Sequence, residues 1–236
     1  MTARTLVIIP AFNEEAALPS VLTGLHARFP GFDIVVIDDG SKDRTSEVAR
    51  LGGAAVVTLP FNLGVGGALR TGFRYAVRNG YRRAVQLDAD GQHDAAEVDA
   101  LLAALEGGAD LVIGSRFATG AGEYHVGRSR RSAMRLMQQA VRILSGETFS
   151  DTSSGFRAFG PGALELFADQ YPIDFLSDSV EALLSALAAG LTVVEVPVQM
   201  NERAGGVPST RRLKLVYHYL RLLVVMTATA PRRRNP

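Results

Sequence analysis

Two carboxylates and an amide lie close together near the middle of the chain, directly after a short apolar run. Residues 84–87 predict a strand, and Asp88, Asp90 and Gln92 follow it at alternate positions. Side chains alternate along a strand, so the two carboxylates point the same way at its end. Such oxygen ligands, with open coordination positions, are typical of a site that holds Mg²⁺ or Mn²⁺ together with substrate phosphates. A polar turn after a buried strand is the alternative.

The composition limits what the rest of the chain can be. Its 236 residues are 47% hydrophobic, which suits one domain with a sizeable core. There are no cysteines, so disulfides, thiolate zinc sites and cysteine nucleophiles are excluded. Residues 1–4 lead straight into an apolar strand without the pattern of a signal peptide. We therefore expect a cytoplasmic protein.

Charge is spread unevenly along the chain. Residues 1–115 carry ten basic and 14 acidic side chains, whereas residues 116–236 carry 15 and ten. The acidic half suits a metal ion, and the basic half suits an anion. Nucleic acid is not expected as a partner, because no basic stripe with interleaved aromatic residues is present.

Strand and helix patterns alternate through the first half of the chain. Segments 5–10, 34–38, 55–59, 84–87 and 111–114 predict strands, and segments 14–28, 45–51, 66–79 and 95–105 predict helices. This alternation predicts an α/β fold with a mostly parallel, Rossmann-like sheet and helices on both faces. Ligands of such sheets bind beyond the carboxyl ends of the strands. We expect the polar loops 10–15, 38–44, 60–67 and 88–94 to meet there.

The second half is less regular. Segments 129–144 and 177–189 predict helices, 151–159 a loop plus a strand, 193–198 a strand and 213–230 a final helix. We find no internal repeat and no low-complexity linker. The pattern therefore predicts a single domain over residues 1–236.

The end of the second strand carries a further pair of acidic residues, Asp38 and Asp39. A carboxylate at this place could accept hydrogen bonds from a base or a ribose, as an acidic residue does in dinucleotide folds. The following glycine and serine also fit an ordinary helix cap and turn.

A glycine-rich segment, Asn62–Ala68, precedes the third helix. It lacks the dinucleotide fingerprint, because Leu69 occupies the position of the last glycine, and it lacks the lysine of a P-loop. Its glycines could present backbone N–H groups to an anion. Close packing of the helix on the sheet explains them equally well.

Four motifs, taken together, resemble family 2 glycosyltransferases with the GT-A fold: Ile9–Glu15, Ile37–Ser41, Asn62–Gly64 and Leu87–Gln92. Gly114–Phe117 and Asp151–Arg157 are similar to the branch that contains dolichol-phosphate mannose synthase and other polyprenyl-phosphate glycosyltransferases. The resemblance covers residues 5 to about 215. It implies a nucleotide-sugar half at 1–115, an acceptor-side half at 116–210 and a C-terminal helix and tail at 211–236.

The resemblance also implies site residues for the donor. It assigns the metal to Asp88, Asp90 and Gln92. It assigns the nucleotide sugar to these three and to Pro10, Ala11, Phe12, Glu14, Asp38, Asp39, Asn62, Gly67, Ala89, Glu181 and Arg203. Glu181 could instead complement a helix dipole. We expect His93 to lie beside the metal ligands or in solvent rather than to bind the metal.

Arginines are implied at the acceptor. Arg116 and Arg130 match residues that hold an acceptor phosphate, and Arg131 or Arg128 could take the place of Arg130. With Asp90, Arg116 and Arg130 form the expected catalytic set. A guanidinium forks onto phosphate oxygens. A phosphate acceptor is mostly dianionic above a pKa of ~6 and needs no general base, so direct displacement would invert the anomeric centre.

Three other functions are weighed against a lipid-phosphate acceptor. A sugar or protein hydroxyl acceptor would require a base. A non-catalytic nucleotide-sugar-binding module would have no need of the intact Asp88, Asp90 and Gln92. A nicotinamide dehydrogenase is disfavoured by Leu69 in the glycine-rich segment.

The C-terminal segment suggests where the protein works. No run reaches the ~20 apolar residues of a spanning helix, but basic residues flank the apolar segment 215–230 on both sides. Such a helix suits the inner face of the cell membrane, where the protein would be peripheral. It could also pack on the core or on another subunit of a homo-oligomer. A small separate membrane protein could supply an anchor.

Overall fold

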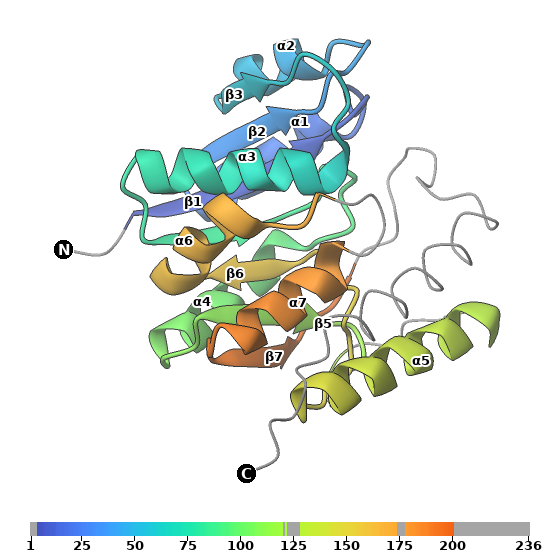
Figure 1. Ribbon diagram of the computed structural model, residues 1–236. Coiled ribbons are helices and arrows are strands. Elements are labelled where there is room, and N and C mark those ends of the chain that lie inside the picture. Colours follow the sequence, from blue (N-terminus) through green and yellow to red (C-terminus); the bar gives the residue numbers. More distant parts are fainter. Residues whose placement is uncertain (1–3, 120, 122–127, 174–177, 201–236) are drawn as a thin grey trace.

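A seven-stranded sheet forms the centre of the protein, in a computed structural model that describes residues 4–119, 121, 128–173 and 178–200 (Figure 1). The strands are β1 (Thr5–Ala11), β2 (Asp33–Asp38), β3 (Ala55–Thr58), β4 (Arg83–Gln86), β5 (Leu111–Ser115), β6 (Arg157–Phe159) and β7 (Val193–Pro197). Their order in the sheet is β3-β2-β1-β4-β6-β5-β7. All pairs are parallel except those of β6, which runs antiparallel to both β4 and β5.

Helices cover both faces of the sheet, as predicted. One face carries α1 (Leu18–Arg28), α2 (Thr45–Leu51), the short 3-10 turn η1 (Ala95–Glu97) and α4 (Val98–Glu106). The other carries α3 (Gly64–Arg78), α6 (Pro161–Gln170) and α7 (Asp178–Ala188) (Figure 1). Because the central strands are covered twice, their sequences are continuous apolar runs rather than alternating ones.

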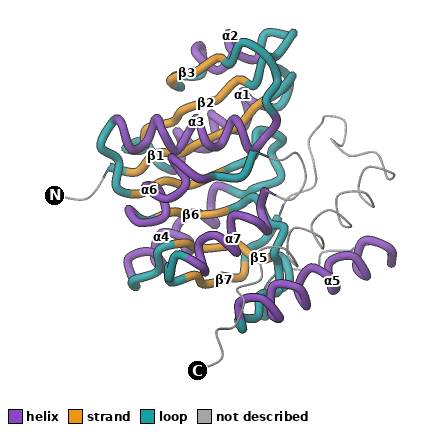
Figure 2. The backbone as a smooth tube through the Cα atoms, viewed as in Figure 1, coloured by secondary structure: helices purple, strands orange, loops and turns teal. Residues whose placement is uncertain are grey.

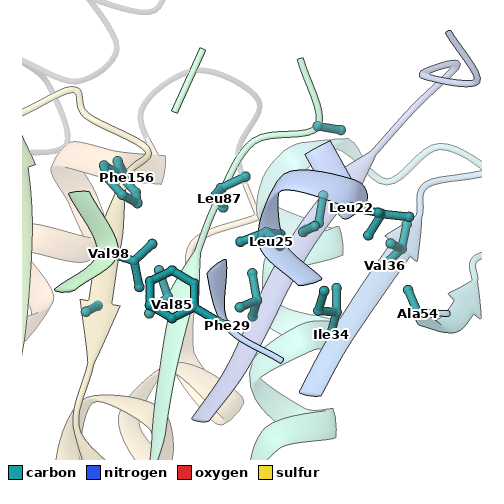
Figure 3. Close-up of a cluster of buried hydrophobic side chains, with 14 of the residues drawn as sticks. Leu22, Leu25, Phe29, Ile34, Val36, Ala54, Val85, Leu87, Val98 and Phe156 are labelled. Carbon is teal, nitrogen blue, oxygen red and sulfur yellow. The ribbon is translucent and has the colours of Figure 1, made fainter. Parts of the chain in front are cut away.

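Each face has its own apolar core. Leu22 and Leu25 of α1, with Phe29 directly after it, pack onto Ile34, Val36 and Val85 of the sheet (Figure 3). On the opposite face the rings of Phe73, Phe159, Phe167 and Tyr171 pack against one another. Burial of these side chains provides most of the driving force for the layered arrangement.

Helix α5 (Arg128–Ser145) lies at the end of the sheet rather than over one face (Figure 1). Its Met137, Ala140 and Val141 pack against Ile113 of β5 and Leu183 of α7. None of the helices that the structure describes is both long and apolar enough to cross a membrane.

The predicted elements of the first half are confirmed to within four residues at each boundary. The largest difference is at α1, which begins at Leu18 rather than residue 14. The backbone N–H groups of Glu14 and Glu15 are bound by Thr45 Oγ1 and Asp43 Oδ2 of the neighbouring loop, and Pro19 lies in the first turn of the helix, where proline is favoured. Helix α6 was not predicted, and neither was the antiparallel direction of β6. The predicted helix 213–230 lies outside the described residues.

Gly24 and Gly72 both lie inside helices, but alanine should affect them in opposite ways. A Cβ at Gly72 would lie 2.4 Å from Cγ2 of Ile8, whereas a Cβ at Gly24 would meet nothing within 4 Å. We expect Gly72→Ala to lower the free energy of unfolding by about 1–3 kcal/mol through overpacking. We expect Gly24→Ala to raise it by up to about 1 kcal/mol. Urea unfolding measures both, and equal changes would contradict the close packing of α3 on β1.

Candidate active site

The loops after β1 and β2 are tied to each other at the carboxyl edge of the sheet, and teal loops follow the strands along the right-hand side of Figure 2. The N–H of Asn13 donates to Ser41 Oγ at 2.9 Å, and the N–H of Lys42 donates to Asn13 Oδ1 at 2.8 Å. Asn13 has a φ of 57°, a left-handed conformation that asparagine tolerates better than most residues. These bonds fix the loop that carries Pro10, Phe12 and Glu14.

The carboxylates of Asp38 and Asp39, at the end of β2, are buried and accept hydrogen bonds from the protein itself. Asp38 Oδ1 accepts from the N–H of Ser41 at 2.8 Å, and its Oδ2 accepts from the hydroxyl of Ser46. The oxygens of Asp39 accept from the N–H groups of Leu63 at 2.7 Å and Gly64 at 2.8 Å. Burial raises the pKa of Asp39, although these two amides favour its ionised form. Asp39 therefore fastens the glycine-rich loop to β2. Each oxygen keeps a second lone pair that could accept from a ribose hydroxyl.

The glycines in the first turn of α3 allow close packing. A Cβ at Gly66 would lie 2.3 Å from the carbonyl oxygen of Pro172, and one at Gly67 would lie 2.5 Å from Cβ of Leu63. Asn62 Oδ1 accepts from the N–H of Gly64 at 3.1 Å and helps to shape the turn. The packing explanation thus accounts for both glycines, and the predicted contact of Asn62 and Gly67 with the donor stays a prediction.

The acidic loop begins after β4 ends at Gln86, so Asp88 and Asp90 lie in a loop and not on the strand itself. The expectation that their carboxylates point the same way stays a prediction. Ala89 packs into the core beneath the sheet's edge, while Asp88 and Asp90 on either side of it lie outside that cluster. The side chain of Asp88 is 39% exposed, and Asp90 is nearly buried. Asp90 Oδ1 accepts from the N–H of Gln92 at 3.0 Å, which closes the turn.

His93 supports this loop from inside. The N–H of Asp88 donates to His93 Nδ1 at 3.0 Å, and the imidazole stacks on Phe156 with ring centroids 4.8 Å apart. Burial lowers the pKa of His93, so the ring is neutral at neutral pH and carries its proton on Nε2. His93 thus lies beside the acidic loop with Nδ1 already engaged, and the expectation that it does not bind a metal stays a prediction.

The donor set of the acidic loop fits a hard cation that is shared with phosphates. Among the described residues there is no group of three or more His, Cys, Asp or Glu side chains that could form a complete metal cage. Two carboxylates and the amide of Gln92 supply part of a coordination sphere, as Mg²⁺ and Mn²⁺ sites with substrate phosphates do. A Cβ at Gly155 would lie 3.2 and 3.3 Å from the two oxygens of Asp88, so a larger residue at this position would crowd that carboxylate.

Arg116 forms a buried ion pair at the tip of β5. Its Nε and Nη2 donate to Asp151 Oδ2 at 2.6 Å and Oδ1 at 2.8 Å, and Nη2 also donates to Ser153 Oγ at 3.1 Å. Asp151 is fully buried. Burial alone would raise its pKa, but the hydrogen bonds and the charge of Arg116 hold the pKa of Asp151 below its ordinary value. The charge of Arg116 adds to the effect of burial in lowering the pKa of His93.

The partner of Arg116 is itself held by two other elements. Glu195 of β7 accepts from the N–H groups of Ser150 and Asp151, both at 2.7 Å. Gln138 of α5 donates to the carbonyl oxygen of Ser150 at 2.6 Å. The sequence had indicated Asp151 only as part of a motif, and nothing in it pointed to Glu195, which lies 44 residues further along.

A second buried arginine braces the same loop. Arg157 is 1% exposed and donates to the carbonyl oxygens of Thr152, Ser154 and Ser179. Since Ser179 begins α7, this arginine connects the loop to the helix that carries Glu181, a predicted donor residue. Glu181 is half-buried in the first turn of that helix.

The structure describes only some of the remaining predicted site residues, which are Arg130, Arg131 and Arg203. Arg130 lies in the first turn of α5, and its side chain is outside what the structure describes. Arg131 is exposed on the same turn of α5. Arg203 lies outside the described residues. The contacts of Arg116, Arg130 and Arg131 with an acceptor phosphate stay predictions.

The ion pair predicts how stability depends on pH. Asp151→Asn should lower the free energy of unfolding by about 3–5 kcal/mol at neutral pH, because Arg116 is left buried without its counter-charge. The folded pKa of Asp151 is lowered. Its contribution is therefore complete above the unfolded pKa of ~3.9 and is lost as pH falls through the folded value. Denaturation across pH should give a constant difference from about pH 7 to about pH 5 that shrinks below about pH 4.

A matched control is Asp99→Asn. Asp99 pairs with Arg28 at the surface, with both side chains 55% exposed, so its loss should cost at most about 1 kcal/mol. A difference for Asp151→Asn that shrinks already between about pH 7 and pH 5 would contradict the lowered pKa.

The model of the family described as glycosyl transferase family 2 matches residues 6–167. Polyprenol monophosphomannose synthase of Mycolicibacterium smegmatis is 36% identical over 214 residues, covering 87% of this chain and 80% of the relative. Undecaprenyl-phosphate mannosyltransferase of Micrococcus luteus is 33% identical over 209 residues, covering 86% of each.

Solved structures share the fold at lower identity. Glucosyl-3-phosphoglycerate synthase of Mycobacterium tuberculosis, in complex with Mn²⁺, uridine diphosphate and glucosyl-3-phosphoglycerate, superposes with a TM-score of 0.70 and 22% identity. The match covers 97% of this chain and 80% of that one. It confirms the predicted GT-A fold of the described residues. With the family model and two relatives above 30% identity in agreement, the chain belongs to glycosyl transferase family 2 and is a glycosyltransferase.

Proposed function

We propose that the protein is a metal-dependent, inverting glycosyltransferase that moves a sugar from a UDP- or GDP-linked nucleotide sugar to a polyprenyl phosphate. The observation that carries this proposal is that Asp88 and Asp90 follow β4 while the buried Arg116–Asp151 pair follows β5, so both lie at the carboxyl edge of one sheet with only β6 between the two strands. Two relatives named for polyprenol or undecaprenyl phosphate support the acceptor. Structural neighbours crystallised with Mn²⁺ or Mg²⁺ and uridine diphosphate support the metal and the donor.

Asp88, Asp90 and Gln92 would hold the cation. When bound, a divalent cation neutralises negative charge that develops on a leaving diphosphate. The chain's own contribution is to keep these oxygens in place. His93 binds the N–H of Asp88, Gly155 leaves room for the carboxylate, and the N–H of Gln92 orients Asp90. A preorganised site loses little energy to rearrangement during the reaction.

The donor's nucleotide would lie along the tips of β1 and β2. The proposed contacts are Pro10, Ala11, Phe12, Glu14, Asp38 and Asp39 at the base and ribose, with Asn62, Gly67, Ala89, Glu181 and Arg203 completing the donor site. Phe12 is 43% exposed, which leaves its ring accessible to a planar base. Asp38 accepts hydrogen bonds from Ser41 and Ser46, and Asp39 accepts them from Leu63 and Gly64, so a ribose would meet carboxylates that are already positioned.

A phosphate acceptor explains why arginines are proposed at the other end of the site. Arg116 and Arg130, with Arg131, would orient the acceptor phosphate. One of its oxygens forms a bond to the anomeric carbon while the bond from that carbon to the diphosphate breaks, and the electron pair leaves with the diphosphate. The nucleophile is already an anion at neutral pH, so no proton has to be removed. The lipid acceptor would bring the protein to the cytoplasmic face of the membrane.

The reaction can be tested with a panel of nucleotide sugars, a short-chain polyprenyl phosphate and Mg²⁺ or Mn²⁺. We expect nucleoside diphosphate to be released from one donor only when the lipid phosphate is present, and we expect chelation of the metal to stop this release. Asp90→Asn should lower kcat by about 100-fold or more, because metal stabilisation of the leaving group is worth several kcal/mol.

Asp99→Asn, a surface substitution of the same kind, should leave kcat within about twofold. Transfer to a sugar or protein hydroxyl but not to the lipid phosphate would contradict the proposed acceptor. Nucleotide binding without turnover under every condition would indicate a binding module. Full activity of Asp90→Asn would contradict the role of the acidic loop.

A further inference from the structure

One surface of the protein has a composition that its packing does not explain: the outer face of α5. We define this face by its exposed residues Arg131, Arg135, Leu136, Arg142 and Ile143. Leu136 is 46% exposed and Ile143 is 75% exposed, although both are large and aliphatic. The whole helix has five arginines and no acidic residue. Apolar and cationic side chains thus share one solvent-facing surface.

The opposite face of α5 packs against the rest of the protein. Met137, Ala140 and Val141 are buried against β5 and α7, and Gln138 binds the carbonyl oxygen of Ser150. The helix is therefore held with its outer face directed away from the core. Leu136 and Ile143 are seven residues apart, which is about two turns, so they lie on the same side. Arg135 and Arg142 directly precede them and share this spacing.

A lipid surface is the partner that uses both kinds of side chain at once. Aliphatic groups enter the boundary between headgroups and acyl chains, and arginines bind the phosphates of anionic lipids. A protein partner would have to combine acidic groups with an apolar contact. An anionic bilayer offers both over its whole surface, and the charge of α5 is complementary to it.

The position of α5 connects this surface to the acceptor end of the site. The helix packs on Ile113, which lies two residues before Ser115 at the tip of β5, and binds Ser150, the neighbour of Asp151. Asp151 holds Arg116. In Figure 1, α5 lies beyond the end of the sheet formed by β5 and β7. A bilayer on its outer face would therefore lie close to the arginine proposed to meet the acceptor phosphate.

We propose that the outer face of α5 docks on an anionic lipid bilayer and brings the Arg116 end of the site to lipid-borne phosphate. The second part of this inference, the delivery of lipid-borne phosphate to the site, rests on the proposed function. The docking of α5 on the bilayer does not depend on that function. The substitutions that test it avoid Arg116, Arg130 and Arg131, the proposed acceptor residues.

The test is flotation of the full chain with vesicles of phosphatidylcholine plus phosphatidylglycerol, without polyprenyl phosphate or nucleotide sugar. The variants are Arg135→Gln with Leu136→Ser, Arg142→Gln with Ile143→Ser, and all four together. One arginine near an anionic surface strengthens partitioning by about fivefold. We therefore expect a loss of about fivefold or more for each pair and about 25-fold or more for the four substitutions. Binding should also fall as salt is raised.

The chain offers a matched control in Arg50 and Leu51 of α2, an adjacent arginine and aliphatic pair. Leu51 is 80% exposed, and α2 covers the opposite end of the sheet next to β3. Arg50→Gln with Leu51→Ser should change partitioning by less than twofold. Thermal unfolding of every variant confirms that it is folded, and the two pairs provide independent tests if the fourfold variant is not.

Three results would overturn the proposal. These are the absence of wild-type binding to the anionic vesicles, equal binding to phosphatidylcholine alone, and equal binding of the α5 variants and the wild type. An assay of transfer to a short, water-soluble polyprenyl phosphate without vesicles distinguishes failure of the docking proposal from failure of the proposed function. We expect the α5 pairs to keep that activity within about twofold. Vesicle binding without any transferase activity would leave the docking intact and remove the proposed function.

Discussion

Asp88 lies where three parts of the chain meet, and the candidate site depends on how they position its carboxylate. From within its own loop, His93 accepts the N–H of Asp88. From the loop before β6, Gly155 faces the carboxylate, and a Cβ at this position would lie 3.2 and 3.3 Å from its two oxygens. At the tip of β5, Arg116 lies within electrostatic reach of the same loop through its effect on His93. These neighbours fix the backbone of Asp88 and leave space around its side chain, which is 39% exposed and accessible to a cation.

The antiparallel direction of β6 makes this meeting possible. In a wholly parallel sheet, the segment before a strand lies at the amino edge, away from the ligand. Because β6 runs the other way, residues 151–156 reach the carboxyl edge between β4 and β5. There Asp151 pairs with Arg116, and Phe156 stacks on His93. Burying an ion pair is costly, and the bidentate geometry together with the bonds from Glu195 to the adjacent backbone offsets that cost.

The sequence predicts those features that depend on local patterns. The central strands β1 and β2 are runs of buried aliphatic residues because both of their faces are covered, and the acidic loop directly after β4 was also found from the sequence. Contacts between distant segments were not predictable. Arg116 pairs with a carboxylate 35 residues away, and many acidic residues lie at comparable distances along the chain. The ten-residue helix α6 was missed as well, although Pro161 in its first turn is a start signal.

The most direct test of this account is a crystal structure of the protein soaked with Mn²⁺ and the nucleoside diphosphate of its donor. Anomalous scattering locates the manganese independently of the nucleotide. The account predicts one Mn²⁺ bound by oxygens of Asp88 and Asp90 and by the diphosphate. A nucleotide bound elsewhere, with no manganese at the acidic loop, would contradict it.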